Sequence, residues 1–267
     1  GINKNQAIHI ERNRVFDNGS SECDGGITVV QQNPGTLIVN NLIYDNGGNG
    51  ISLISADEGS LYIVNNAIHT NHWNGVRVVQ SREIFIVNNI ITQNGAADGA
   101  TGGRYGLLRE GPPKLQPQEI HLLNNLICGN RLAQVKGPVL DSTDSGNLTP
   151  QGTEGVGVNA SPGCEIPANV YANVNGPDGL PNTADDDFTL VLGSPVIDRG
   201  MDPRTLGLSV LFNPILESDF LTEAARPSDG NADRIIAFDI GAFEIPNEPP
   251  IANAGSGQTT FRGALVV

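Results

Sequence analysis

Five polar and aromatic side chains in the first half of the chain could bind a sugar polymer. They are Trp73, Arg77, Tyr105, Glu110 and Lys136. An exposed Trp or Tyr ring can stack on a pyranose face, and a guanidinium can pair with a uronate carboxylate. These five residues are therefore the candidate substrate-binding strip for a polysaccharide. The alternative is a solvated surface carrying one packed Trp.

Cleavage of the polymer would need a base or a pair of carboxylates. For a lyase, which removes a proton from a uronate ring, the candidate bases are Arg77, Lys136, His72 and Tyr105. A glycosidase needs two opposed carboxylates, and Glu110 with Asp57 or Glu58 is the pair to consider. No residue is singled out as catalytic by the sequence. It leaves open whether the chain is a polysaccharide lyase, a glycoside hydrolase or no enzyme.

An acidic, glycine-rich loop later in the chain offers oxygen ligands for a metal. Its candidate ligands are Asn175, Asp178, Asp185 and Asp187. Calcium prefers such flexible shells of hard oxygen atoms, so we expect a structural Ca²⁺ there. An EF-hand is excluded because no Glu stands at the twelfth position. The alternative is a solvated acidic loop, and Asp229–Asp233 is a second, weaker candidate.

A repeated segment organises the residues that must hold these side chains. TLIVNNLIYDNG from Thr36 returns in related form from Leu61, Glu83 and Glu119, with a divergent copy from Ala7. The second Asn of each pair falls at Asn13, Asn41, Asn66, Asn89 and Asn125, and another Asn stands five residues later at Asn18, Asn46, Asn71, Asn94 and Asn130. Repeat spacings between 23 and 36 residues are typical of a solenoid.

Each repeat reads as short strands because apolar and polar residues alternate with a period of two. One repeat cannot bury its own apolar face, so stacked copies must share a core, with like residues in register and asparagines in columns. If Ile27, Ile51, Val76 and Leu107 point inward, then Thr28, Ser52, Arg77 and Leu108 point outward. Arg109 or Glu110 lies two positions further on, and Lys136 extends the outward face.

This pattern resembles the right-handed parallel β-helix of the pectate-lyase-like superfamily. The resemblance covers roughly the first half of the chain and implies an all-β fold, a parallel β-helix. We expect about six coils followed by an irregular C-terminal cap. The WxDH and RxPxxR patterns that pectate lyases of this superfamily carry do not occur. The resemblance therefore implies the fold and leaves the activity open.

Two insertions flank the strand at 106–110. One lies between Asn94 and Gly106 and the other between Gly106 and Asn125. Loops inserted on one face of a solenoid commonly form the walls of a binding surface. The alternative is that the loops simply vary in length.

The C-terminal half carries two short motifs. GSPVIDRG ends at Gly200 and DIGAFE ends at Glu244. This pair resembles the C-terminal segment of bacterial β-helix proteins of the choice-of-anchor kind, which implies a segment that ends the helix. PPIANAG from Pro249 resembles the start of a PKD-type domain. The predicted divisions are coils over 1–138, a last irregular coil and capping segment over 139–245, and a linker with the first PKD-like strand over 246–267.

Composition narrows the functional classes. A net charge of −14 disfavours nucleic acid and anionic membranes as partners, and no apolar run approaches the length for membrane insertion. Of the three cysteines, Cys128 and Cys164 could form a disulfide or remain unpaired buried thiols. Gly1 stands in mid-repeat, so we expect further domains on both sides in an extracellular or surface protein of a bacterium. The leading function is polysaccharide recognition, with or without cleavage. The rival is a non-catalytic stalk or adhesin.

Overall fold

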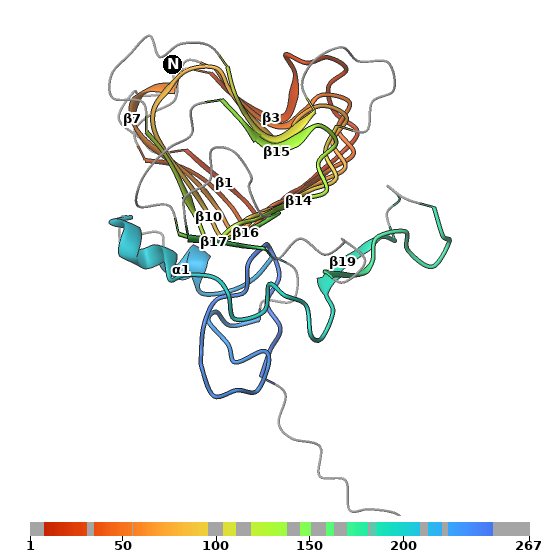
Figure 1. Ribbon diagram of the computed structural model, residues 1–267, viewed down its shortest axis with the longest axis vertical. Coiled ribbons are helices and arrows are strands. Elements are labelled where there is room, and N and C mark those ends of the chain that lie inside the picture. Colours follow the sequence, from red (N-terminus) through yellow and green to blue (C-terminus); the bar gives the residue numbers. More distant parts are fainter. Residues whose placement is uncertain are drawn as a thin grey trace, which may run out of the picture.

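The computed structural model describes residues 8–30, 35–54, 56–95, 104–110, 119–137, 145–150, 159–162, 170–180, 183, 185–208, 213–220 and 224–247. These residues form an all-β solenoid with parallel strands (Figure 1). The segment from 248 onward, with the predicted PKD-like strand, lies outside the described residues, as do residues 1–7. In the described part, no helix is long and apolar enough to cross a membrane.

Three stacks of parallel strands make the walls of the solenoid. The first stack is β1 (His9–Glu11), β4 (Thr36–Val39), β7 (Ala56–Val64), β10 (Ser81–Val87) and β13 (Glu119–Leu123). The second stack is β2 (Arg14–Val15), β5 (Leu42–Tyr44), β8 (Ala67–His69), β11 (Ile90–Thr92) and β14 (Leu126–Cys128). The third stack is β3 (Gly25–Val30), β6 (Asn49–Ile54), β9 (Val76–Val78), β12 (Tyr105–Arg109) and β15 (Ala133–Lys136).

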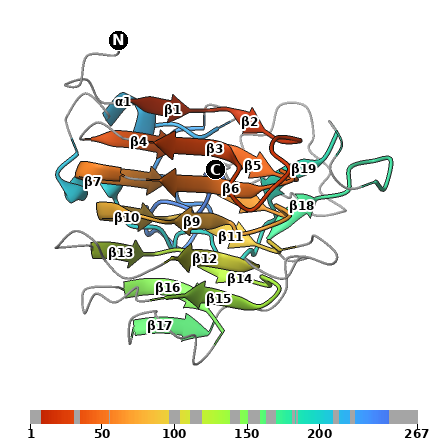
Figure 2. The same cartoon turned by 90° about the horizontal axis from the view of Figure 1, so that it is seen from above.

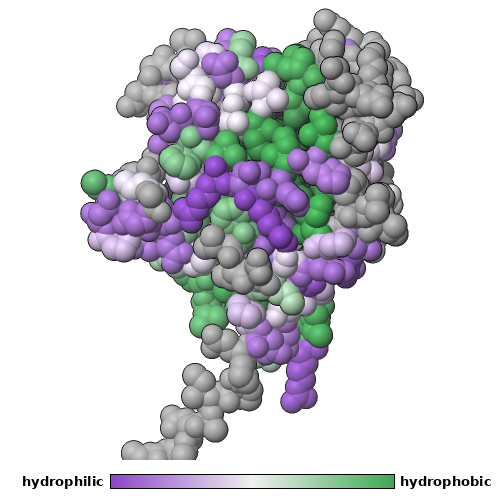
Figure 3. Space-filling view, turned by 180° about the vertical axis from the view of Figure 1, so that it is seen from behind, coloured by the Kyte–Doolittle hydropathy of each residue, from purple (hydrophilic) through white to green (hydrophobic). Residues whose placement is uncertain are grey.

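Alternation along each strand places one set of side chains in the core. Ile38, Ile63, Ile86 and Leu122 lie in register on successive coils and are fully buried. At the β1–β3 end, Ile10, in register with Ile38, and Val15, in register with Ile43, are only partly buried. Figure 3 shows hydrophobic residues gathered at the back of the molecule. The core is thus a continuous column of Ile, Leu and Val, as the period of two predicts.

The second Asn of each pair forms a ladder inside the corner between the first and second stacks. The Nδ2 of Asn41 donates to Asn66 Oδ1 at 3.0 Å, and the same bond recurs from Asn66 to Asn89 and from Asn89 to Asn125. Asn125 donates onward to Asn147 in β16 (Ser145–Thr149). The column of asparagines is confirmed, and 145–149 continues the stack. β17 (Asn159–Pro162) pairs with β16 in turn.

A second ladder runs through the Asn five residues later in each repeat. Asn18, Asn46, Asn71, Asn94 and Asn130 are joined by side-chain hydrogen bonds, and the ladder ends on Gln134. Each amide spans the separation between two coils. Both ladders therefore satisfy buried polar groups at the turns of the solenoid.

The first Asn of each pair makes the sharp corner itself. Asn40, Asn65, Asn88 and Asn124 have φ angles of 52°, 53°, 53° and 51°, the left-handed region that Asn adopts more readily than most residues. Their side chains project outward, where those of Asn40, Asn88 and Asn124 meet the C-terminal segment.

The C-terminal segment, 170–247, runs along the side of the solenoid (Figures 1 and 2). It contains the antiparallel pair β18 (Tyr171–Asn173) and β19 (Asp187–Leu190), the 3₁₀ helix η2 (Pro203–Leu206) and α1 (Asn213–Leu216). Phe188, Val196 and Phe243 pack on the second stack, and Leu208 and Leu216 pack on the first. We expected an end cap, whereas the described part of this segment covers a flank, because outward-facing Leu42, Tyr44 and Val87 need burial.

Candidate functional site

The candidate strip lies on the outer face of the third stack. Thr28, Ser52, Arg77, Leu108 and Lys136 stand in one register column. The alternating column of Ile27, Ile51, Val76, Leu107 and Val135 faces the core. Arg77 and Lys136 therefore share the outward face, as predicted from the alternation. Figure 2 looks onto this stack with its strands side by side.

Arg77 and Glu110 form a two-pronged ion pair between adjacent coils. Arg77 Nε donates to Glu110 Oε1 at 2.9 Å and Nη2 donates to Oε2 at 2.7 Å. Arg109 aligns with Val78 in the inward column, which leaves the outward place to Glu110. Burial works to lower the pKa of Arg77, but hydrogen bonding and the charge of Glu110 outweigh it, so the pKa of Arg77 is raised.

Ser52 lies beside Arg77 on this face and carries a buried hydroxyl. The residue is 0% exposed and Arg77 is 8% exposed, although both point away from the core. Ser52 Oγ has no hydrogen-bond partner in the described structure. A buried hydroxyl without a partner is unfavourable. This part of the outer face is thus polar and partly enclosed, and sugar binding there stays a prediction.

The two aromatic candidates occupy different positions. Trp73 is half-buried in the turn before β9, where its backbone N–H donates to Gly48 O at 3.1 Å. Tyr105 lies one coil beyond Asn74, and its backbone N–H donates to Asn74 Oδ1 at 3.0 Å. That column continues the buried pair of Asn74 and Asn49. By strand register, Tyr105 therefore lies in the column of Asn49 and Asn74 and not in that of Arg77. Arg77, Glu110 and Lys136 lie on one face.

Other predicted contributors are spread around this face. Lys136 is exposed at the far end of the column. His72 Nε2 lies 3.3 Å from Asp45 Oδ1 in the turn leading to β9. The side chains of Asp57 and Glu58 and most of both insertions, 96–103 and 111–118, lie outside the described residues. A groove walled by the insertions stays a prediction.

The acidic loop satisfies its carboxylates with local donors. Asp178 Oδ1 accepts from Leu180 N at 2.8 Å, Asp185 Oδ1 from Thr183 Oγ1 at 2.6 Å, and Asp187 Oδ1 from Thr189 N at 2.9 Å. Asn175 is exposed. Within the described residues, these carboxylates do not gather as a group of three possible ligands. Structural calcium in this loop stays a prediction.

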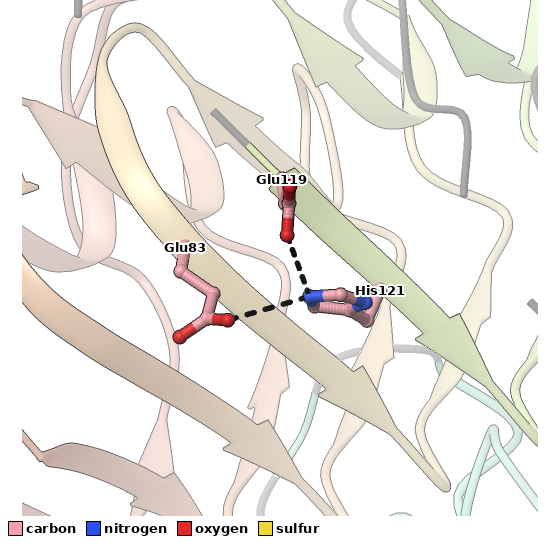
Figure 4. A group of neighbouring side chains, drawn as sticks. All are labelled: Glu83, Glu119 and His121. Carbon is pink, nitrogen blue, oxygen red and sulfur yellow. Dashed lines mark ion pairs between the residues drawn. The ribbon is translucent and has the colours of Figure 1, made fainter. Parts of the chain in front are cut away.

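One cluster that could hold a metal was missed by the sequence reasoning. Glu83, Glu119 and His121 offer ligand atoms that all lie within 4.8 Å of one another on the outer face of the first stack (Figure 4). The signal was present, since Glu83 and Glu119 open the repeats EIFIVNN and EIHLLNN at the same position. Strand alternation then puts residue 121 on the same face as Glu119.

A buried charged centre was missed as well. Arg226 and Glu244 are joined at 3.0 Å between Nε and Oε2, and both side chains are essentially inaccessible. Arg226 also donates to the backbone oxygens of Gly241 and Phe243. Asp239 accepts from the N–H groups of Asp198 and Ile245. The DIGAFE motif thus supplies buried carboxylates that hold the C-terminal segment together. Nothing in the sequence pointed to Arg226 as its partner.

The cysteines are of two kinds. Cys128 is disulfide-bonded, and Cys23 has a free, exposed thiol. Cys164 lies outside the described residues. Of the two predicted states for Cys128, a disulfide or an unpaired thiol, the structure has the disulfide.

The comparisons agree with this architecture. The family model described as "Right handed beta helix region" matches residues 1–108. Neither the curated proteins nor the solved structures give a match. The chain folds as a right-handed parallel β-helix.

Proposed function

We propose that this chain is an extracellular β-helix module that binds polysaccharide along the outer face of the third stack. The observation that carries the proposal is the Arg77–Glu110 pair, set at outward positions of adjacent coils, in which Arg77 is buried and the Glu110 side chain is 39% exposed. Glu110 holds the Arg77 guanidinium in a fixed orientation, and its exposed carboxylate offers hydrogen-bond acceptors to a ligand at this position.

The location supports this face over the other two. The C-terminal segment packs on the outer sides of the second stack and of part of the first. In Figure 1 it lies on the opposite side of the solenoid from β3 and β15. The third stack is therefore the face that the described C-terminal segment leaves for a partner.

The charges favour a neutral sugar polymer. Glu110 offsets the charge of Arg77, so the pair presents donors and acceptors to sugar hydroxyls in place of a net positive charge. The protein carries −14 overall, which repels polyanions such as polyuronates at low ionic strength. Trp73, half-buried before β9, supplies an apolar ring near the same strand.

The disulfide at Cys128 supports an extracellular location, since disulfides persist in oxidising compartments. Extracellular modules meet polysaccharides directly.

Binding to a panel of soluble polysaccharides tests the proposal. We expect affinity electrophoresis to show retardation by at least one neutral polymer, such as a galactomannan, xyloglucan or β-glucan. Arg77→Ala should weaken that binding at least tenfold, because a charge-assisted hydrogen bond contributes about 1.5–3 kcal/mol.

Arg204→Ala is the matched control. Arg204 makes the same kind of pair with Asp202, at 2.7 and 2.8 Å, on the C-terminal segment, and its removal changes the net charge equally. Retardation by polygalacturonate alone would contradict the charge argument. If no polysaccharide binds, or if Arg77→Ala binds like Arg204→Ala, the proposed function is wrong. Reducing ends and unsaturated uronates in the same samples would reveal cleavage.

A further inference from the structure

The cluster of Glu83, Glu119 and His121 lies on the first stack, away from the polysaccharide face. Glu83 on β10 stands directly opposite Glu119 on β13, and Phe85 stands opposite His121. All three ligand side chains therefore project from the same side of two adjacent strands (Figure 4).

The two glutamates form an unfavourable pair by themselves. Like charges at directly opposed positions of neighbouring strands destabilise a sheet. The overall charge of −14 adds to the cost of placing two carboxylates together. A cation between them would turn this repulsion into attraction.

The interatomic distances fit a shared ion better than direct hydrogen bonds. His121 Nε2 lies 3.6 Å from Glu83 Oε1 and 3.8 Å from Glu119 Oε2. Hydrogen bonds of this type span about 2.7–3.2 Å. Two ligand atoms bound tetrahedrally to one ion, each about 2.0–2.2 Å from it, lie about 3.4 Å apart. Small side-chain movements would bring the three atoms onto one metal.

Neighbouring groups hold the ligands in place. The His121 ring stacks on Phe85 with centroids 4.4 Å apart, and Phe85 stacks on Tyr62 at 5.1 Å. Ser60 Oγ donates a hydrogen bond to Glu83 Oε2, which leaves Oε1 directed at His121. Outer partners of this kind orient metal ligands. The His121 side chain is only 12% exposed, so its ring position is defined.

We propose that Glu83, Glu119 and His121 bind a divalent transition-metal ion, with Zn²⁺ as the representative. One imidazole nitrogen with two carboxylate oxygens suits zinc and its neighbours, whereas Ca²⁺ and Mg²⁺ prefer all-oxygen shells. Three ligands from a flat sheet leave at least one coordination position open to water. This site is independent of the proposed polysaccharide binding.

Isothermal titration with ZnCl₂ after dialysis against EDTA tests the site. We expect one bound Zn²⁺ per chain and a higher melting temperature with the ion. His121→Phe keeps a ring against Phe85 but removes the nitrogen ligand, so it should lower the affinity at least tenfold. Glu119→Gln should do the same, and its half-exposed position makes misfolding no concern.

His72→Ala is the control, because His72 and Asp45 form another pair of a histidine with a carboxylate. Retained affinity in this variant and loss in the other two supports the proposal. Absence of Zn²⁺ binding to the wild-type protein, or loss of binding in His72→Ala instead, overturns it. Equal affinity for Ca²⁺ that also depends on His121 overturns the transition-metal assignment.

Discussion

Asn88 and Met201 exchange two hydrogen bonds although they lie 113 residues apart in the chain. Asn88 Nδ2 donates to Met201 O at 2.8 Å, and Met201 N donates back to Asn88 Oδ1 at 2.9 Å. The side chain thus imitates a backbone pairing at a corner of the solenoid. Through it, the C-terminal segment is attached to the repeat.

Asn88→Ala is expected to destabilise the protein more than Asn65→Ala. Both positions have a φ of 53° and are fully buried, so the conformational cost is the same. Asn65 makes no side-chain hydrogen bonds in the described structure. At about 1 kcal/mol for each lost bond, the two variants should differ by about 2 kcal/mol. Urea denaturation measures the difference, and equal stabilities would contradict the attachment.

In the ladder formed by the second Asn of each pair, substitution in the middle should destabilise the protein much more than substitution at the end. Asn66 Nδ2 donates to Ile38 O, Val64 O and Asn89 Oδ1. Asn66→Ala leaves these buried acceptors without that donor, so we expect a loss of at least about 3 kcal/mol. Asn13→Ala, at the exposed end, should cost about 1 kcal/mol. Chemical denaturation of both variants tests this order, and a reversed order would argue against the ladder.

Substitution of Arg226 should destabilise the protein far more than substitution of Arg204, although both side chains are paired with carboxylates. Arg226→Met leaves the buried Glu244 carboxyl, whose pKa burial already raises to about 8, without its cation, and removes the bond to Asn40 Oδ1. We expect a loss of about 3–5 kcal/mol. Arg204→Met breaks a partly exposed pair with Asp202 and should cost about 0–1 kcal/mol.

The double variant Arg226→Met with Glu244→Gln isolates the buried charge. It should recover part of the stability lost in the single variant, since no unpaired carboxylate remains. A double variant as unstable as the sum of two independent losses would show that the charges are not coupled.

We expect the protein to lose stability in acid because His69 is buried in its neutral form. Burial among Tyr171 and Phe188 lowers its pKa to about 4, and Nδ1 lies 2.9 Å from Thr92 Oγ1. In the unfolded chain the pKa is about 6.5, so below that pH the unfolded state binds the proton first. The neutral ring therefore makes its full contribution to the free energy of unfolding above pH 6.5. That contribution falls by about 3 kcal/mol as the pH is lowered to 4.

His69→Gln removes this titration, and its amide can still reach Thr92. The variant should show a shallower decline between pH 6.5 and 4 in urea denaturation, while His9→Gln at an exposed position should follow the wild type. An identical pH profile for His69→Gln and wild type would mean that the ring is not buried neutral.

The sequence repeat predicted those parts of the fold that are set by contacts within one coil or between adjacent coils. The direction of Arg77 followed from Val76 because side chains alternate along a strand, and the ladders followed from the spacing of the asparagines. Contacts between distant segments left no periodic signal. Asn65 and Asn88 look alike in the sequence, yet only Asn88 meets the C-terminal segment. Arg226 belongs to no repeat, so its pairing with Glu244 could not be foreseen.

We propose that polysaccharide binds to the outer face of the third stack, and hydrogen–deuterium exchange with and without a bound polymer locates the binding surface. We expect slower exchange in peptides covering β6, β9 and β12, and no such change in Arg77→Ala at the same polymer concentration. Protection confined to the C-terminal segment or to the first stack, with β6, β9 and β12 unchanged, would contradict it.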